Sequence, residues 1–506
     1  MKRVFTLLLA FMMVFCLFAC KSEPKADEGQ NGEKQNQEDA TNTTFDTLAV
    51  GVGRADITPD DPIGAHINGG GDPNRLATNI LDDLAVTCVA VTDENNTTVL
   101  FFHQDIHNPS AASFTDEARQ SISSATGVPV ENIYMSATHT HSSLHPKDGT
   151  NEKNEAFNVK YQLAIVEAAK AAMADRAPAT MSAGTMDAKE ENGGQAMAFV
   201  RHISKMDGTV WGSNFGSYQP QLFNGFPYEA DNEAQLIKFD REGKDPVLMM
   251  NWPAHSTFHG TTALKNISGD YPVYVRRYIE ENSNMTVAIF LGGAGDQTPN
   301  SQYMAADHGL ECDAYGAKLG ELVLNFMAVD GNMTAVEDGT IKQNSYVLTA
   351  DSNFIPEEQQ DLAAKAQDVY DFFLENGQEQ GNSYAQANGF QSCYEARSFV
   401  SRMNLEPTQS LPLYVMSLGN MSFAIAPYEM AGQTATTIKH AILESGEFDM
   451  AFIMAYSQDN IGYIPSASNY EYNNGRGSYE AYDCKYAKGT AEQIAETYIQ
   501  LLTDLK

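Results

Sequence analysis

Two histidines stand at the end of an apolar segment. His139 and His141 belong to the run Ser136-Ala-Thr-His-Thr-His141, which follows the predicted strand 132–137. In an extended backbone, side chains two residues apart point to the same face, so both imidazoles can address one pocket. Neutral imidazole is the commonest metal ligand in proteins. A structural role for the pair fits the same pattern, and the pair alone does not decide between the two.

A further histidine follows a second apolar segment. His255 ends the run Asn251-Trp-Pro-Ala-His255, after the predicted strand 246–252, and His259 lies four residues further on. A helix over these residues would place both rings on one face. The Gly-Thr-Thr sequence that begins at Gly260 favours a loop instead, so His255 is the stronger candidate ligand.

A carboxylate and two tyrosines complete the set of candidates. Glu429 follows the apolar segment 421–426. A carboxylate there suits a metal ligand or a base, and it equally suits the start of a helix over 430–443, whose dipole it would favour. Tyr463 and Tyr479 lie in a later loop-rich stretch, where tyrosines also serve in packing. Two histidines and a glutamate at strand ends, with a tyrosine late in the chain, together suit a catalytic zinc ion with one open position.

The order of these motifs resembles the catalytic domain of the neutral/alkaline, non-lysosomal ceramidases, which are zinc-dependent amidases. The run 136–141 is the most specific match. The other matching segments, in chain order, are Val52-Gly-Arg-Ala-Asp-Ile-Thr-Pro59, Asp105 after a strand, Asn251–His255, the hexapeptide Gly295-Asp-Gln-Thr-Pro-Asn300, Pro427-Tyr-Glu429, Gly462-Tyr-Ile464 and Tyr479-Glu480. They extend over nearly the whole chain after residue 47.

The resemblance implies a role for individual residues. The residues that it implies as ligands of one zinc ion are His139, His255, Glu429 and Tyr463. It implies that His141 and Tyr479 flank the scissile amide, together with Arg201. We expect the metal to activate the attacking water, His141 to carry a proton to the leaving amine, and Tyr479 and Arg201 to stabilise the carbonyl oxygen. Asp105 is expected to orient a ligand imidazole.

Three features depart from the family pattern. Thr298 replaces the serine of the hexapeptide; it keeps a hydroxyl group in the candidate site, and we expect a structural role for it because metal-activated water can serve as the nucleophile. The segment 63–75 lacks the arginine-rich sequence that is usual in the family, so the loops that face the substrate are expected to have diverged. The chain ends at Lys506, and the additional C-terminal β-sandwich of the full-length ceramidases is not expected.

Strand and helix patterns alternate along the chain. Strands are predicted at 84–92, 97–103, 132–137, 246–252, 286–291, 413–418 and 421–426, and helices at 112–125, 155–174, 270–282, 313–328, 357–375, 430–443 and 490–504. Interleaved strands and helices indicate an α/β fold with mixed β-sheets flanked by helices. We find no internal repeat, and residues 47–506 are expected to form one large catalytic domain without a β-sandwich after it.

The first residues are expected to direct the protein out of the cytoplasm. Lys2 and Arg3 precede an apolar run that is too short for a confident membrane span, and the run ends at Ala19-Cys20. This resembles a bacterial lipobox, which makes residues 1–20 a lipoprotein signal and Cys20 the lipidation site on a bacterial membrane; a plain secretory signal is the alternative. Residues 21–46 are polar and are expected to be a flexible tether.

Composition limits the kinds of partner. The 506 residues include 32 Lys and Arg against 66 Asp and Glu, a formal charge of −34, so a nucleic-acid partner is not expected. Outside the signal, Cys88, Cys312, Cys393 and Cys484 are too widely spaced for a zinc ribbon. They allow three disulfide pairings, and Cys88, in an apolar strand, also fits a free thiol in the core.

Three functional hypotheses follow. The first is a zinc-dependent amidohydrolase that cleaves an N-acyl amide, either a ceramide or another N-acylated lipid or small amide. The second is a zinc hydrolase of a different substrate, such as a deacetylase or an esterase, because ester and amide cleavage share a tetrahedral intermediate. The third is a lipoprotein that binds a ligand without catalysis.

Overall fold

The computed structural model describes residues 43–69, 75–109, 112–144, 146, 151–211, 224–260, 265–299 and 310–506, without the side chains of 112–114 and 211. The described residues all belong to one compact unit. The predicted signal with Cys20 and most of the predicted tether lie outside the described residues. The same holds for His145, a further histidine four residues after His141 in the sequence. Among the described residues, no helix has the length and apolar character needed to cross a bilayer.

The larger of two main sheets has nine strands. Eight follow the order β13-β11-β10-β6-β1-β3-β4-β5, and β15 pairs with β6. In chain order these strands are β1 (Ala49–Asp56), β3 (Ala85–Thr92), β4 (Thr98–Gln104), β5 (Ile133–Ala137), β6 (Ala177–Asp187), β10 (Glu233–Arg241), β11 (Val247–Trp252), β13 (Thr286–Leu291) and β15 (Thr334–Val336). The pairs β4–β5 and β11–β13 are parallel and the others antiparallel, so the sheet is mixed.

The smaller sheet faces the larger one across an apolar layer. Its order is β16-β17-β18-β20, and its strands are β16 (Ile341–Asp351), β17 (Thr408–Leu418), β18 (Met421–Ile425) and β20 (Met450–Met454). Phenylalanine rings fill the space between the sheets: Phe101 stacks on Phe423 with ring centroids 5.7 Å apart, and Phe290 meets Phe452 edge to face at 6.1 Å. Such contacts bury large apolar side chains from both sheets in one core.

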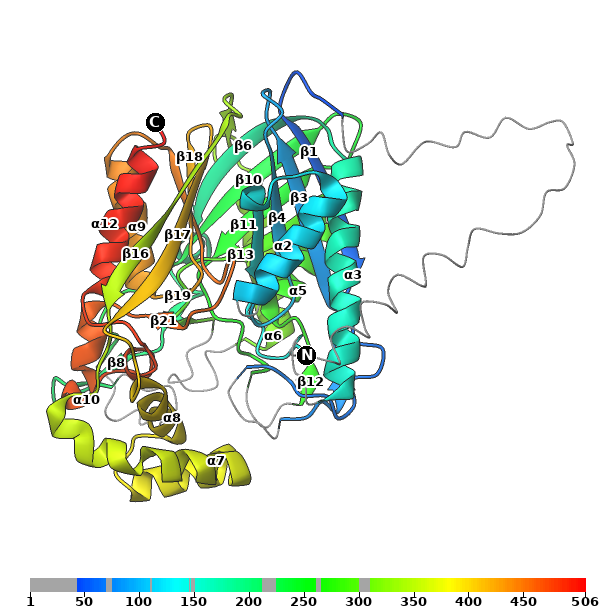
Figure 1. Ribbon diagram of the computed structural model, residues 1–506. Helices are drawn as coiled ribbons and strands as arrows, with labels where there is room; N and C mark the ends of the chain where they lie inside the picture. The colour runs from blue at the N-terminus through cyan, green and yellow to red at the C-terminus, as the bar shows by residue number, and fades with distance from the viewer. Residues whose placement is uncertain are drawn as a thin grey trace, which may run out of the picture. The chain divides into compact units, whose positions relative to one another are not determined.

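Helices cover the outer face of each sheet (Figure 1). On the larger sheet lie α2 (Ala112–Thr126), α3 (Glu152–Ala174), α5 (Tyr271–Glu281) and α6 (Cys312–Met327), and on the smaller sheet lie α9 (Gly432–Glu444) and α12 (Thr490–Thr503). Residues 43–506 therefore contain a helix–sheet–sheet–helix arrangement. The helices α7 (Gln360–Ala387) and α8 (Cys393–Arg402) pack on each other around a separate apolar cluster.

Helix α3 shows how the sequence specifies this packing. Asn151 caps the helix, because its side chain accepts a hydrogen bond from the Lys153 amide at 3.0 Å. The apolar face recurs at helical spacing through Phe157, Tyr161, Ala164, Ile165, Ala168 and Ala172. Small residues at the end of this face let the helix approach β1 closely, opposite Gly51 and Gly53.

The predicted fold class is confirmed, and each predicted element has an observed counterpart. The largest differences in length are in α7, which continues to Ala387, and β17, which begins at Thr408. The patterns did not predict four long or central strands and one helix, namely β6, β10, β16, β20 and α8.

Cys88, Cys312, Cys393 and Cys484 are all free and buried. Burial raises the pKa of the Cys88 thiol well above its usual value and that of Cys484 to about 11. The prediction that Cys88 is a free core thiol is confirmed, and none of the three possible pairings is present.

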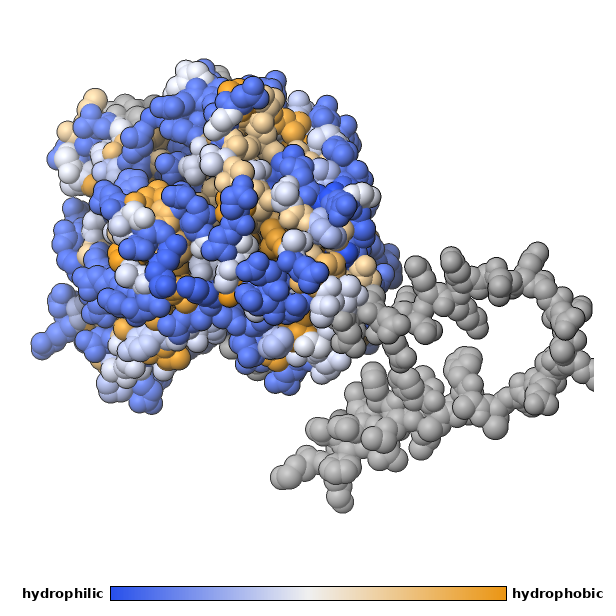
Figure 2. All heavy atoms as spheres, turned by 90° about the horizontal axis from the view of Figure 1, so that it is seen from above, coloured by the Kyte–Doolittle hydropathy of each residue, from blue (hydrophilic) through white to orange (hydrophobic). Residues whose placement is uncertain are grey.

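Hydrophilic residues dominate the face of the molecule seen from above (Figure 2). Figure 2 shows a face covered mostly by hydrophilic residues, with more apolar residues gathered in a band across it. Folded proteins ordinarily expose apolar residues among the hydrophilic ones in this way.

Candidate metal centre

The candidate site lies where three parallel strand pairs end. The pairs are β4–β5, β11–β13 and β18–β20. The loops after these strands carry His107, His139, His255, Glu429 and Tyr456, and these side chains meet at one edge of the two sheets. The Ala137 amide donates to the Tyr456 carbonyl at 3.0 Å, which joins the two sheets at this edge. Strand ends thus bring together residues that are over 300 positions apart.

Three of the four predicted zinc ligands form a compact buried group. One ligand atom from each of His139, His255 and Glu429 lies within 4.8 Å of the others. Oε2 of Glu429 is 3.4 Å from Nε2 of His139 and 3.7 Å from Nε2 of His255. Ligands of one zinc ion lie about 2.0–2.2 Å from it, so atoms at these separations can share an ion.

Two atoms of this group have unmet bonding capacity. Nε2 of His255 and Oε2 of Glu429 are buried and have no hydrogen-bond partner. Leaving a buried polar atom unpaired costs about 1–3 kcal/mol. A divalent cation coordinated by these atoms would remove that cost, and the donor set of two imidazoles and a carboxylate fits zinc.

The other ring nitrogen of each histidine is held by main-chain oxygen. Nδ1 of His139 donates to the His107 carbonyl at 2.8 Å, with Oδ1 of Asn108 at 3.1 Å. Nδ1 of His255 donates to the Ala294 carbonyl at 2.9 Å. Because carbonyl oxygens only accept, Nδ1 carries a proton in both rings, and Nε2 can bind a metal once it is deprotonated.

The prediction that Asp105 orients a ligand histidine is wrong. Its carboxylate lies 3.0 Å from Nε2 of His103 and accepts from Arg276 at 2.9 Å and from the Ala85 amide at 3.0 Å. These contacts bind the end of β4 to helix α5. The groups that hold Nδ1 of His139 are instead Asn108 and the carbonyl of His107.

Tyr463 is placed beside Glu429 by a short strand pair. Residue 463 in β21 (Tyr463–Ile464) stands opposite residue 429 in β19 (Glu429–Met430), and the Gly462 carbonyl accepts from the Glu429 amide at 3.1 Å. Burial alone would raise the pKa of Glu429. The interactions with His139 and His107 and a hydrogen bond from Tyr463 outweigh burial, and the pKa of Glu429 is lowered. The carboxylate is therefore ionised at neutral pH, as metal binding requires.

His141 reaches the same centre from the loop after β5. Its ring centroid is 5.0 Å from that of His139 and 5.1 Å from that of His255. Burial, and then the neighbouring imidazoles, lower its pKa well below the usual value, so the ring is neutral. Nε2 of His141 is buried without a hydrogen-bond partner. The ring therefore has a nitrogen available for proton transfer.

Arg201 and Tyr479 lie on the tyrosine side of the centre. The guanidinium of Arg201 is 5.9 Å from the Tyr463 ring centroid and donates to Glu480 at 2.9 Å and to the carbonyl of Gly295. Tyr479 starts helix α11 (Tyr479–Tyr482), and its ring is 5.4 Å from that of Tyr463. The structure thus brings both predicted substrate-facing residues to Tyr463.

Thr298 lies on the strand pair that carries Arg201. It is buried in β14 (Gln297–Thr298) opposite Phe199 of β7 (Phe199–Val200). The neighbouring Gln297 carbonyl accepts from the His255 amide at 3.1 Å, so this hexapeptide supports the His255 loop. The position suits the structural role expected for Thr298.

Sequence reasoning missed two residues of the centre. His107 stacks 4.2 Å from His139 and forms a second potential metal group with His139 and His141. Tyr456 stacks 4.2 Å from His139, and its hydroxyl is 3.4 Å from Nδ1 of His255. His107 had a usable signal, since it follows β4 by three residues. His139 belongs both to this group and to the group with His255 and Glu429, and only its Nε2 can bind a metal. The two groups are therefore alternative positions for one ion.

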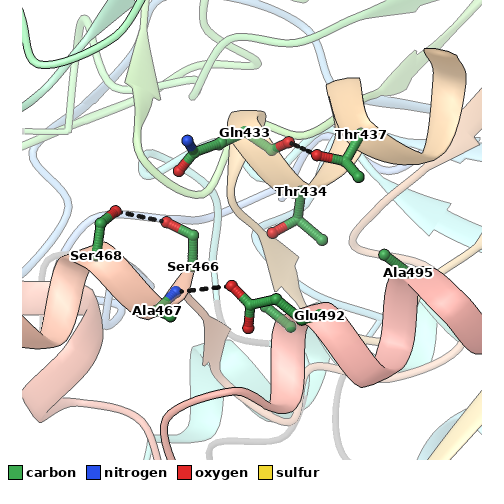
Figure 3. A pocket seen from close by; sticks show the side chains of 9 residues that line it. Gln433, Thr434, Thr437, Ser466, Ala467, Ser468, Glu492 and Ala495 are labelled. Carbon is green, nitrogen blue, oxygen red and sulfur yellow. Dashed lines mark hydrogen bonds between the residues drawn. The ribbon is translucent and has the colours of Figure 1, made fainter. Parts of the chain in front are cut away.

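A cavity of about 290 Å³ lies elsewhere, between the first turns of α9 and α12 (Figure 3). Its walls are mainly small and hydroxyl-bearing residues, and Glu492 accepts there from the Ala467 amide at 3.1 Å. None of the predicted site residues lines it. It is therefore separate from the metal centre.

Comparison with known proteins gives structural relatives only. No protein-family model matches the chain, and no curated protein matches it by sequence. The solved structure of neutral ceramidase from Pseudomonas aeruginosa matches with a TM-score of 0.65 and 15% identity, over 91% of this chain and 74% of that one. A ceramidase complexed with C2 matches with a TM-score of 0.64 and 15% identity, over 91% and 75% of the two chains. One of these two structural neighbours is thus a bacterial neutral ceramidase and the other is described as a ceramidase, and the described residues share their mixed α/β fold.

Proposed function

We propose that the protein is a zinc-dependent hydrolase that cleaves the N-acyl amide bond of a ceramide or a closely related N-acylated lipid. The observation that carries the proposal is the buried group of His139, His255 and Glu429, in which Nε2 of His255 and Oε2 of Glu429 have no hydrogen-bond partner. It lies at the sheet edge of a fold shared with proteins described as ceramidases. Tyr463, beside Glu429, is the fourth ligand in this proposal.

The side chains around the ion have separate tasks. A zinc ion held there would supply Lewis acidity and a water nucleophile active at neutral pH. His141, neutral and with a buried unpaired Nε2, carries a proton to the amine that leaves. Tyr479 and Arg201 donate to the substrate carbonyl oxygen as negative charge develops on it. Glu480 fixes the Arg201 guanidinium through the 2.9 Å contact. The products are a carboxylic acid and an amine.

Membrane attachment fits this substrate class. In the proposal, Cys20 is lipidated and residues 21–46 tether the body to a bacterial membrane, outside the cytoplasm. An enzyme held at a bilayer meets lipid substrates at a high local concentration. The attachment is tested by metabolic labelling with a lipid precursor, which should mark the native chain and not a Cys20→Ala variant.

The deciding experiment measures metal content and hydrolysis together. We expect about one zinc ion per full-length chain in detergent, and cleavage of a short-chain fluorescent ceramide that a chelator abolishes and added zinc restores. His255→Ala should lose both the ion and the activity, because it removes a ligand. His440→Ala, which changes an exposed histidine on α9, should lose neither.

The other outcomes separate the remaining hypotheses. Bound zinc without ceramide cleavage would contradict the ceramide assignment and direct a screen toward other amides and esters, since a deacetylase or esterase needs the same ion. Absence of both zinc and hydrolysis would overturn the proposal in favour of a ligand-binding lipoprotein. Full activity in a His139→Ala variant would overturn the ligand assignment.

A further inference from the structure

Arg75 is one of the largest fully buried side chains and lies beside the centre without belonging to it. It is 1% exposed. One terminal nitrogen, Nη1, donates to the carbonyl of His141. The other, Nη2, donates to the carbonyl of His259 at 2.8 Å and to the Ser142 hydroxyl at 3.2 Å. A single guanidinium therefore joins the loop after β5 to the loop after β11.

The same two loops are linked by further hydrogen bonds. The His141 amide donates to the Ser256 carbonyl at 3.1 Å, and the Ser142 hydroxyl donates to the His259 carbonyl at 2.9 Å. On the other side, the Asn68 amide donates to the Ser143 carbonyl at 2.8 Å. Arg75 thus lies at the centre of a network that fixes the main chain of residues 141–143.

Glycines restrict where the His141 ring can go. A Cβ atom added to Gly69 would lie 2.7 Å from Cα of His141, and one added to Gly260 would lie 2.7 Å from its Cβ. Backbone therefore approaches His141 closely from both sides. Arg75 holds the carbonyl of His141, and glycine backbone packs against its Cα and Cβ atoms. These contacts restrict the main chain of His141 to one position.

We propose that Arg75 is a positioning residue, which holds His141 where it can exchange a proton with the substrate amide at the metal centre. The inference rests on the proposed function. Arginine suits the task because its planar fork presents donors in fixed directions to two carbonyls at once, which the single ammonium of lysine does not. The segment 63–75, which departs from the ceramidase pattern, thereby acquires a role in this chain.

The test compares Arg75→Lys and Arg75→Ala with the unchanged full-length protein. Both variants should keep about one zinc ion per chain, because no zinc ligand is changed. The kcat for amide hydrolysis should fall about 100-fold, the loss typical of a displacement of about 1 Å, while KM changes less than threefold. Millimolar guanidinium chloride should partly restore Arg75→Ala.

A second readout does not depend on catalysis. Amide hydrogen exchange of the peptides that contain residues 141–144 and 256–260 should be faster in Arg75→Lys, with exchange elsewhere unchanged. The matched control is Arg119→Lys. Arg119 is also buried and donates to a carbonyl, that of Val130 at 2.7 Å, but it does so before β5 rather than after it. This control should keep its kcat and its exchange at 141–144.

The outcomes distinguish this inference from the proposed function. Wild-type kcat, or wild-type exchange at 141–144, in Arg75→Lys would overturn the positioning role. Loss of zinc in Arg75→Lys would also overturn it, because the residue would then support the metal ligands instead. If Arg75→Lys exchanges faster at residues 141–144 but the unchanged protein hydrolyses no amide, Arg75 still fixes the main chain of residues 141–143. That result would refute the proposed chemistry instead.

Discussion

At the scale of single residues, the centre is built so that its ligands are oriented without an ion. Both candidate ligand histidines donate from Nδ1 to a main-chain carbonyl. His139 also has a φ of 55° and Tyr456 a φ of 54°, which is an unfavourable conformation for residues other than glycine. Such strain is concentrated at functional sites, where the surrounding structure maintains it. The geometry of the imidazoles is thus fixed by the fold.

Asn108 provides a prediction at this scale. Its Oδ1 lies 3.1 Å from Nδ1 of His139 and accepts from Asn460 at 2.7 Å, so it couples the His139 loop to the Tyr463 loop. Asn108→Ala should weaken zinc binding about 10- to 100-fold, the usual effect of removing an outer contact of a ligand histidine. Competition with a chromogenic chelator measures this. Asn108→Asp, which keeps an acceptor, should bind more tightly than Asn108→Ala, and equal affinities would contradict the coupling.

Residue chemistry also explains how much of the site could be predicted. His139, His255 and Glu429 were recognisable because each follows an apolar strand, and a strand end places a side chain at the sheet edge. Tyr456 follows β20 in the same way, but its contact with the imidazoles depends on a positive φ that no residue pattern reveals. The pairing of Asp105 with Arg276 connects segments 171 residues apart, and spacing along the chain could not indicate it.

At the scale of elements, close contact between β1 and α3 holds the larger sheet against its helices. Gly53 permits this contact, since an added Cβ would lie 2.3 Å from the Ala168 carbonyl oxygen and 2.6 Å from the Ala172 amide nitrogen. Neither neighbour can move alone, because both are main-chain atoms of a helix. The strand and helix would have to separate.

Gly53→Ala should therefore destabilise the protein by about 1–3 kcal/mol, the range for overpacking a core, while leaving the zinc content unchanged. Urea unfolding followed by circular dichroism measures the change. Gly339→Ala is the control, because its added Cβ would meet only the Leu48 side chain, at 3.2 Å. If both substitutions cost the same, the tight backbone approach would not be the cause.

Three of the strands that the sequence patterns missed share a physical explanation. The segment Ala177–Asp187 of β6 consists mostly of Ala, Thr and other small residues, and it offers no apolar run. In β10, buried Ala, Leu, Ile and Phe are interrupted by Glu, Gln, Lys and Asp. Strand β16 is largely exposed at the sheet edge. These segments form strands because they pair with neighbouring strands, and the composition of the segment alone does not predict that pairing.

At the scale of the whole molecule, buried neutral histidines make stability depend on pH. Burial lowers the pKa of His202 to about 4; Asp296 opposes this effect and Arg201 adds to it. In the unfolded chain a histidine titrates near 6.5. Between these two values the unfolded chain binds a proton that the folded chain does not, so stability falls as the pH is lowered from about 6.5 to 4.

His202→Gln should reduce this dependence. Without zinc, the loss of unfolding free energy between pH 7 and pH 5 should be about 1–2 kcal/mol smaller in the variant than in the unchanged protein. Urea titrations at the two pH values in the presence of a chelator measure it. The exposed His440→Gln serves as the control, and an equal loss in the His202 variant and the unchanged protein would show that His202 is protonated in the folded state.

The four buried thiols determine how the folded part of the chain responds to oxidising and reducing conditions during expression and purification. A disulfide-dependent protein acquires its final covalent structure only where an oxidant is present. Here Cys88, Cys312, Cys393 and Cys484 are unbridged and inaccessible, and a thiol with a raised pKa reacts slowly because the thiolate is the nucleophile. The body is therefore expected to reach the same covalent state in a reducing cell interior and outside it, and to tolerate dithiothreitol during purification.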